Sequence, residues 1–321
     1  MAGILLVAMM LGGSGCTTEC RGAACGDLYT AADLQVSTGL NAEPVLTLSG
    51  TNEVGRDWSV QLAGERLWVG QPDAAELVLW NTEGQQVDRL YNSDVDNFGE
   101  SLALVDGWGV VGAPRHATVG EGTESGALYF YKDMETLDQF PESFDRRIVG
   151  EVGERLGAGL ATCGDLDQDG SRELLVRAEW SDVGGQLSGA LSLLSSSQFE
   201  EAQRSDLHLL EGLSLADGGA LGKGMVCDQA LGSLDTLPEV IAGAPFASNG
   251  VVSGAGRVLI WSNGAGQPFH FFGEKESDYF GYSVAVGDLD GNGRPDLVVG
   301  APGVDAVGAD GVAVAGMGGA V

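Results

Sequence analysis

The sequence repeats itself, and this repetition restricts the possible folds more than any other feature. Laid on itself, the 321-residue chain gives five aligned segments, which begin at Arg56, Phe98, Leu156, Leu221 and Phe280. Each segment reads as an apolar strand, a turn or loop of variable length, a second apolar strand, and Gly-Ala-Pro or a remnant of it. A third strand and, in several repeats, a weaker fourth strand follow, as at 126–132 and 146–150. Four short strands per repeat without a helical period predict an all-β fold, a β-propeller with one blade per repeat.

The charge of the chain narrows the range of its partners. It carries 46 acidic and 16 basic side chains, which give a formal net charge of −30. A nucleic-acid binder needs a basic surface, so we expect no nucleic-acid partner. An anionic membrane surface would repel the chain, whereas divalent cations would be attracted to it. We therefore expect contact with a membrane only through a lipid anchor.

The glycine motifs resemble a known type of repeat. The second and last segments each begin with Phe-Gly and reach Gly-Ala-Pro, at 98–99 and 112–114 and at 280–281 and 300–302. They resemble FG-GAP repeats, the units of the integrin α-subunit propeller and of its bacterial relatives. The resemblance covers about residues 44–321. It implies an extracellular role in adhesion or interaction.

Two repeats depart from this pattern, and the number of blades is left open. Arg-Asp replaces Phe-Gly at 56–57, and Arg-Ala-Glu replaces Gly-Ala-Pro at 177–179. Five repeats are fewer than the family usually closes, so a closed five-bladed ring and an incomplete ring are both open readings. A strand is expected at 44–50, where it would complete the last blade and close the ring.

Two acidic loops, each between the first and second strands of a repeat, predict calcium sites. In each loop, oxygen-bearing side chains stand at the first, third, fifth and ninth positions, glycine stands at the sixth, and the seventh offers its backbone carbonyl. The ligands in the third repeat would be Asp165, Asp167, Asp169, the carbonyl of Ser171, and Glu173. The ligands in the last repeat would be Asp288, Asp290, Asn292, the carbonyl of Arg294, and Asp296.

These loops do not read as EF-hands, because Val176 and Val299 stand where an EF-hand needs its bidentate glutamate. Apolar β-formers follow in place of a helix, so the loops resemble the calcium-binding hairpin loops of FG-GAP blades. Clustered carboxylates repel one another unless a cation neutralises them. A flexible loop of hard oxygen ligands suits Ca²⁺ better than Mg²⁺. The alternative is a pair of acidic surface turns in which Asp serves only as a turn former.

The first residues read as a bacterial export signal. The apolar run at 4–11 is too short to span a bilayer but fits the core of a signal peptide. The Gly-Ser-Gly-Cys that follows resembles a lipoprotein cleavage box and makes Cys16 the lipidated residue. We expect a signal peptide at 1–16, a tether at 17–43 and the propeller at 44–321, in a lipoprotein of the cell surface or outer membrane. Plain secretion, including to the periplasm, and a buried N-terminal segment are the alternatives.

The other four cysteines suit an oxidising compartment. Cys20 and Cys25 are close enough to pair within the tether. Cys163 and Cys227 occupy nearly the same place in successive repeats. They could form a disulfide, but we favour two buried thiols.

No stretch of the sequence carries an enzymatic motif. The phosphate-loop likeness of 218–225 fails at both ends, and His116, His208 and His270 lie in separate repeats. The sequence thus favours a non-enzymatic, calcium-stabilised propeller whose loops bind an unidentified protein or glycan. The alternative is the propeller part of a secreted calcium-dependent hydrolase or lyase. A carboxylate cluster in the central channel would favour that alternative.

Overall fold

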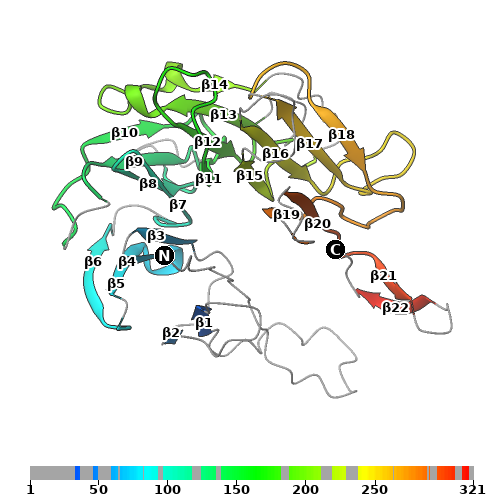
Figure 1. The fold of residues 1–321 in the computed structure, drawn as a ribbon, viewed down its shortest axis with the longest axis horizontal. Coiled ribbons are helices and arrows are strands. Elements are labelled where there is room, and N and C mark those ends of the chain that lie inside the picture. The colour runs from blue at the N-terminus through cyan, green and yellow to red at the C-terminus, as the bar shows by residue number, and fades with distance from the viewer. Residues whose placement is uncertain are drawn as a thin grey trace.

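The computed structural model is an all-β propeller, as predicted (Figure 1). It describes residues 33–36, 46–49 and 59–317, with gaps inside the last range at 64–65, 82, 93–96, 118–123, 135–138, 182–187, 211–218, 229–237, 263, 288, 290–294 and 308–312. Among the described residues, all long regular elements are strands, and the helical segments are three short 3₁₀ turns.

Four repeats each form a four-stranded antiparallel sheet with the strands in chain order. Blade 1 consists of β3 (Ser59–Ala63), β4 (Arg66–Gln71), β5 (Glu76–Asn81) and β6 (Gln86–Tyr91). Blade 2 consists of β7 (Ser101–Val105), β8 (Trp108–Ala113), β9 (Ala127–Tyr131) and β10 (Arg146–Val149). Blade 3 consists of β11 (Leu156–Thr162), β12 (Glu173–Ala178), β13 (Ala190–Ser195) and β14 (His208–Leu209). Blade 4 consists of β15 (Met225–Asp228), β16 (Glu239–Ala244), β17 (Arg257–Ser262) and β18 (Phe269–Phe272).

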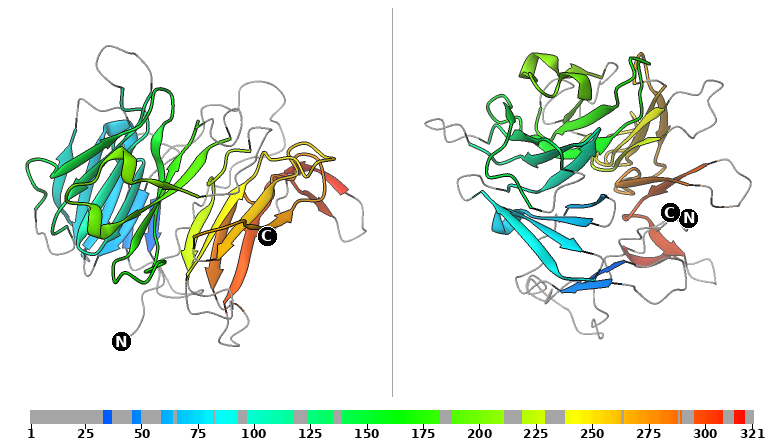
Figure 2. Two further views of the ribbon diagram at one scale, coloured as in Figure 1. Left: turned by 90° about the horizontal axis from the view of Figure 1, so that it is seen from above. Right: turned by 60° about the vertical axis from the view of Figure 1, so that its left-hand side comes forward.

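The remaining strands form three two-stranded sheets. The last repeat contributes β19 (Ser283–Gly287) paired with β20 (Asp296–Gly300), and then β21 (Asp305–Val307) paired with β22 (Ala313–Met317). The first strands of successive repeats, β3, β7, β11, β15 and β19, contact one another in turn. They form the inner edge of the propeller, and the blades fan outward from them (Figure 2).

The expected closing strand pairs differently. β2 (Leu46–Ser49) pairs with β1 (Asp33–Val36), which lies inside the segment expected as a tether, and not with a strand of the last repeat. A short connection makes such a local hairpin entropically cheap, whereas closing the ring would join the two ends of the chain. The two hairpins β1–β2 and β21–β22 lie between the first and last blades (Figure 2). No pairing among the described strands closes the ring.

The hydrophobic core lies between adjacent blades. One cluster fills the space between blades 1 and 2, with Trp68, Phe98 and Tyr129 buried in it. Two further clusters lie between blades 2 and 3 and between blades 3 and 4. Each central strand therefore buries both faces, which explains why the second strand of a repeat reads as a continuous apolar run.

The two glycines of the motif meet at the seam between neighbouring blades. A methyl group on Gly112, the first residue of Gly-Ala-Pro in blade 2, would overlap the carbonyl of Gly157 in blade 3. The same relation holds between Gly70 and Gly99 and between Gly243 and Gly281, from blade 1 to 2 and from blade 4 to the last repeat. Only glycine lets the two backbones approach so closely.

Serines reinforce two of these seams. Ser59 Oγ donates to the carbonyl of Gly99 at 2.8 Å, and Ser101 Oγ donates to that of Gly157 at 2.7 Å. The sequence alignment did not single out these serines. They stand at the same place in their repeats, two residues after the second position of the Phe-Gly dipeptide, and this recurrence is the signal that could have identified them.

The expectation of two buried thiols was wrong. Cys163 and Cys227 form a disulfide between blades 3 and 4, with their Cα atoms 4.9 Å apart. Cys163 directly follows β11, and Cys227 lies in β15, the neighbouring inner strand. Equivalent positions in adjacent blades face each other across the seam, a relation that the sequence spacing alone does not reveal.

Candidate metal centre

The loop between β11 and β12 is the acidic loop predicted in the third repeat. Its base is closed by two backbone hydrogen bonds, from Cys163 N to the Glu173 carbonyl at 2.7 Å and from Glu173 N to the Gly164 carbonyl at 3.3 Å. The acidic loop therefore protrudes from a closed hairpin. Glu173, its last residue, is also the first residue of β12. This position fixes one carboxylate on a rigid strand, while the aspartates stand on the loop.

Four predicted ligand residues converge. Asp165, Asp167, Asp169 and Glu173 each offer a carboxylate oxygen, and these oxygens all lie within 4.8 Å of one another. Asp167 and Asp169 are exposed, Asp165 is half-buried and Glu173 is buried. The alternative, in which the aspartates serve only as turn formers, does not account for a buried glutamate in the same cluster.

The aspartate side chains of the loop accept hydrogen bonds from the backbone of the same loop. Asp165 Oδ1 accepts from Asp169 N at 3.1 Å, and Asp165 Oδ2 accepts from Gly170 N at 3.0 Å. Asp167 Oδ1 also accepts from Asp169 N, and Asp169 Oδ1 accepts from Ser171 N at 2.7 Å. Gly170 has φ +92°, a conformation that favours glycine, as expected for the sixth position. Ser171, the predicted carbonyl donor, directly follows this turn.

Glu173 supplies the sharpest electrostatic feature of the cluster. It is 5% exposed, and its Oε2 accepts a hydrogen bond from Leu166 N at 2.6 Å. Its Oε1 is buried without a hydrogen-bond partner in the structure. Burial, followed by the charges of Asp167, Asp165 and Asp169, raises the pKa of Glu173 to about 7, although the Leu166 hydrogen bond acts in the opposite direction. A buried oxygen of this kind suits a cation, because a cation both pairs it and reverses the repulsion.

Neighbouring elements hold the loop in place. Asp106, in the β7–β8 turn of blade 2, accepts from Arg172 N at 3.0 Å and from Ser196 Oγ at 2.6 Å through Oδ2. Asp-Gly is a pair typical of tight hairpin turns, and Asp106 and Gly107 both have positive φ. The Asp106 side chain thus reaches from a turn of blade 2 to the acidic loop of blade 3. A pocket of about 320 Å³ opens beside the cluster, with Asp167, Asp169 and His208 in its lining.

The second predicted loop lies mostly outside the described residues. Asp288, Asp290, Asn292 and Arg294 belong to this undescribed part, as does Cys16 at the other end of the chain. Asp296 begins β20 as Glu173 begins β12, and its Oδ2 accepts from Leu289 N at 2.9 Å. Leu166 N makes the equivalent contact with Glu173. The ninth-position carboxylate therefore has the same backbone partner in both loops.

The three histidines lie in three different blades, and Trp180 follows β12. His208 and His270 lie exposed on β14 and β18, the outer strands of their blades. His116 is half-buried against Tyr129, with 3.4 Å between Nδ1 and the hydroxyl oxygen. Trp180 is 41% exposed. Within the described residues, the group of potential metal ligands contains no histidine.

Comparison with known proteins identifies similar repeats and similar chains. Residues 280–317 match the family model of the FG-GAP repeat. The comparisons support an FG-GAP, integrin-α-like family. Integrin alpha-PS2 of Drosophila melanogaster is 36% identical over 92 residues, and integrin alpha-IIb of Mus musculus is 44% identical over 77 residues. These matches cover 29% and 23% of this chain, and 6% and 7% of the two integrins.

A third match covers more of the chain at lower identity. Integrin alpha-5 of Xenopus laevis is 25% identical over 232 residues, which are 71% of this chain and 16% of that protein. The chain thus spans only a small part of the length of these relatives. The solved structure titled "Structure of Dos1 propeller" is also similar, with a TM-score of 0.43, 14% identity, and coverage of 69% of this chain and 46% of that one. Within the described residues, no helix combines the length and apolarity needed to cross a membrane.

Proposed function

We propose that this protein is a calcium-binding, integrin-α-like propeller that serves as an adhesion or interaction module outside the cell and catalyses no reaction. The observation that carries the calcium part is the convergence of four carboxylates around Glu173, whose buried Oε1 lacks a partner. Hard oxygen ligands on a flexible loop suit Ca²⁺, whereas Mg²⁺ requires closer octahedral order. By its equal spacing, the loop at 288–296 is proposed as a second site.

The interaction role is supported by the FG-GAP match and by the integrin relatives. The partner is proposed to be a protein or glycan. The clustered carboxylates lie in a loop at one rim of the blade and not in the central channel, which counts against the hydrolase or lyase alternative. Calcium would then act structurally by holding the rim loops rigid.

Export and anchoring complete the proposal. The leader-like start and the lipoprotein box support a signal peptide at 1–16, lipidation of Cys16 and a surface location. A disulfide between blades 3 and 4 is consistent with an oxidising compartment.

Thermal melts test the calcium proposal. We expect millimolar Ca²⁺ to raise the melting temperature over EDTA, by on the order of 3 °C per site, because ligand at tenfold over Kd stabilises by about 1.4 kcal/mol. Equal Mg²⁺ should give a smaller rise. The double variant Asp167→Asn/Asp169→Asn should lose the contribution of the first site, whereas Asp73→Asn, an exposed carboxylate in blade 1, should retain the full shift. If Ca²⁺ does not raise the melting temperature of the wild-type protein, the calcium proposal is wrong.

A further inference from the structure

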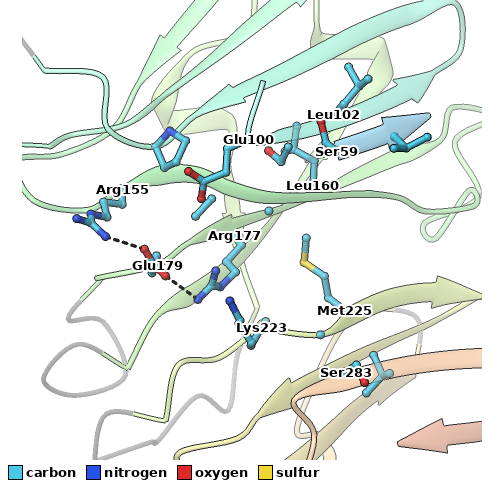
Figure 3. A pocket seen from close by; sticks show the side chains of 18 of the residues that line it. Ser59, Glu100, Leu102, Arg155, Leu160, Arg177, Glu179, Lys223, Met225 and Ser283 are labelled. Atoms are coloured by element: carbon cyan, nitrogen blue, oxygen red, sulfur yellow. Dashed lines mark hydrogen bonds and ion pairs between the residues drawn. The ribbon is translucent and has the colours of Figure 1, made fainter. Parts of the chain in front are cut away.

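A pocket of about 640 Å³ lies where the inner strands of all five repeats begin (Figure 3). Its lining includes Ser59, Ser101, Leu160, Met225 and Ser283, one residue from each inner strand. Its charged lining residues are Glu100, Arg115, Arg155, Arg177, Glu179 and Lys223. Four of the 16 basic residues of the chain therefore gather in one pocket, against two carboxylates, in a protein whose net charge is −30.

Two of these charges arise where the third repeat departs from the FG-GAP pattern. Arg177 stands at the place of the seam glycines Gly70, Gly112 and Gly243. Glu179 stands at the place of the proline in Gly-Ala-Pro. Lys223 belongs to the turn that opens the next repeat, directly after Gly222. The seam between blades 3 and 4 thus carries Arg177 and Glu179 where the other seams carry glycine and proline.

Arg177 and Arg155 are held in place around Glu179. Arg177 is 4% exposed, and its Nε donates to the Leu221 carbonyl at 2.8 Å. Arg155 Nη1 lies 3.0 Å from Glu179 Oε2, and Arg177 Nη2 lies 3.5 Å from Glu179 Oε1. Burial alone would raise the pKa of Glu179, but the charges of Arg177, Arg155 and Lys223, with the Arg155 hydrogen bond, hold it below its usual value. The pocket therefore stabilises negative charge at a half-buried position.

Lys223 is the cation that an incoming ligand can engage. Its side chain is exposed to the pocket and lies near the Arg177–Glu179 pair (Figure 3). Within the described part of the chain, no carboxylate lies within ion-pair distance of its ammonium group. Its Nζ lies 5.6 Å from the centre of the Tyr282 ring. An ammonium group in this position retains hydrogen-bond donors for an anion.

From this geometry we infer that the central pocket binds a carboxylate presented by an acidic side chain of a protein partner. The inference deepens the proposed interaction function and rests on it. Glu124, just outside the lining, pairs with both Arg155 and Arg115, so the four cations face three carboxylates with Glu100 and Glu179. The remaining excess of one positive charge suits a singly charged carboxylate, and Lys and Arg donors give charge-assisted hydrogen bonds. Arg, Trp and Tyr together are also the residue types that dominate binding energy at protein interfaces.

A glycan ligand fits less well. Arg155 lies over the Trp180 ring at 3.2 Å from its centre, and Lys223 lies over Tyr282, so a cation already covers one face of each ring. Those faces are not free to stack on a sugar. In addition, the net charge of −30 opposes a polyanionic glycan much more than a single carboxylate.

Calorimetric titration with capped peptides tests the inference. Capped Gly-Glu-Gly should bind about tenfold more tightly than capped Gly-Gln-Gly, because only the carboxylate engages the cations. Lys223→Gln and Arg177→Gly should each weaken the Glu peptide about tenfold, toward the Gln level. Arg177→Gly restores the residue that other repeats carry at this place, and melts of both variants check folding. Lys275→Gln, the same charge change on an exposed residue outside the pocket, should alter binding less than about twofold.

Three results would overturn the inference: equal binding of the two peptides, unchanged binding by Lys223→Gln, or tighter binding of trigalacturonate than of the Glu peptide. The calcium melts report on a different place. β11 begins at the pocket and ends at the acidic loop, so the two features lie at opposite ends of one hairpin. Peptide binding without a calcium shift, or a calcium shift without peptide binding, would separate the failure of one proposal from that of the other.

Discussion

The two oxygens of Glu173 have different surroundings, and the difference defines what the acidic loop can do. Oε2 accepts a hydrogen bond from Leu166 N, whereas Oε1 is buried without a partner beside three aspartates. The shift of its pKa to about 7 means that the folded protein binds a proton here more tightly than the unfolded chain does. In the absence of a metal, this residue contributes stability below pH about 4.5 that is lost as pH rises through about 7.

This residue makes calcium stabilisation dependent on pH. Because Ca²⁺ requires the ionised carboxylate, the rise in melting temperature caused by Ca²⁺ should be larger at pH 8 than at pH 5.5. Glu173→Gln should remove most of this difference and weaken the response to Ca²⁺, while Glu142→Gln, an exposed carboxylate of blade 2, should behave as wild type. Melts in EDTA and in Ca²⁺ at both pH values provide the measurement. A calcium shift of equal size at both pH values would contradict the role given to Glu173.

Among the elements, the seams between blades explain the repeat motif. Gly112 and Gly157 bring the backbones of blades 2 and 3 together, and Ser101 donates to the same carbonyl. Between blades 3 and 4, the disulfide and the buried Arg177 replace this arrangement. The motif is therefore a packing device, and the repeat that lacks it has a covalent link and charged side chains at the corresponding seam.

Adding one methyl group to a seam should be costly. Gly112→Ala would drive Cβ into the Gly157 carbonyl and Ser101 Oγ, and we expect it to reduce the free energy of unfolding by about 2 kcal/mol, in the range of other overpacked sites. Gly287→Ala is the matched control, because a Cβ there meets nothing within 4 Å. It should change stability by less than about 0.5 kcal/mol. Urea unfolding followed by circular dichroism compares the two, and equal effects would refute the seam argument.

For the whole molecule, sequence patterns predicted the structure within each repeat and missed the contacts between different repeats. Most strands and the convergence of the first acidic loop were predicted, because each depends on neighbouring residues. The Asp106 contact to the loop and the charged pocket were not predicted, and the disulfide was named only as the less favoured alternative, because all three join residues from different blades. β6, with a less regular apolar pattern than the other outer strands, was also missed.

The anchor is a prediction for the whole molecule. Cells that express the wild-type chain should incorporate a palmitate analogue into the protein, and Cys16→Ala should abolish the labelling. Cys25→Ala serves as the control, because it removes a thiol outside the predicted cleavage box. Unchanged labelling of Cys16→Ala would exclude lipidation at this residue.

The glycine seams also bear on how such a ring can evolve. A carbonyl set against a neighbouring Cα makes no demand on side chains at the contact itself, so a second strand that ends in the tripeptide can meet any blade that opens with the dipeptide. After a unit is duplicated or deleted in the gene, the apolar side chains between the new neighbours are then what has to match. The seam that contains Arg177 and the disulfide instead ties its two blades to each other as a fixed pair.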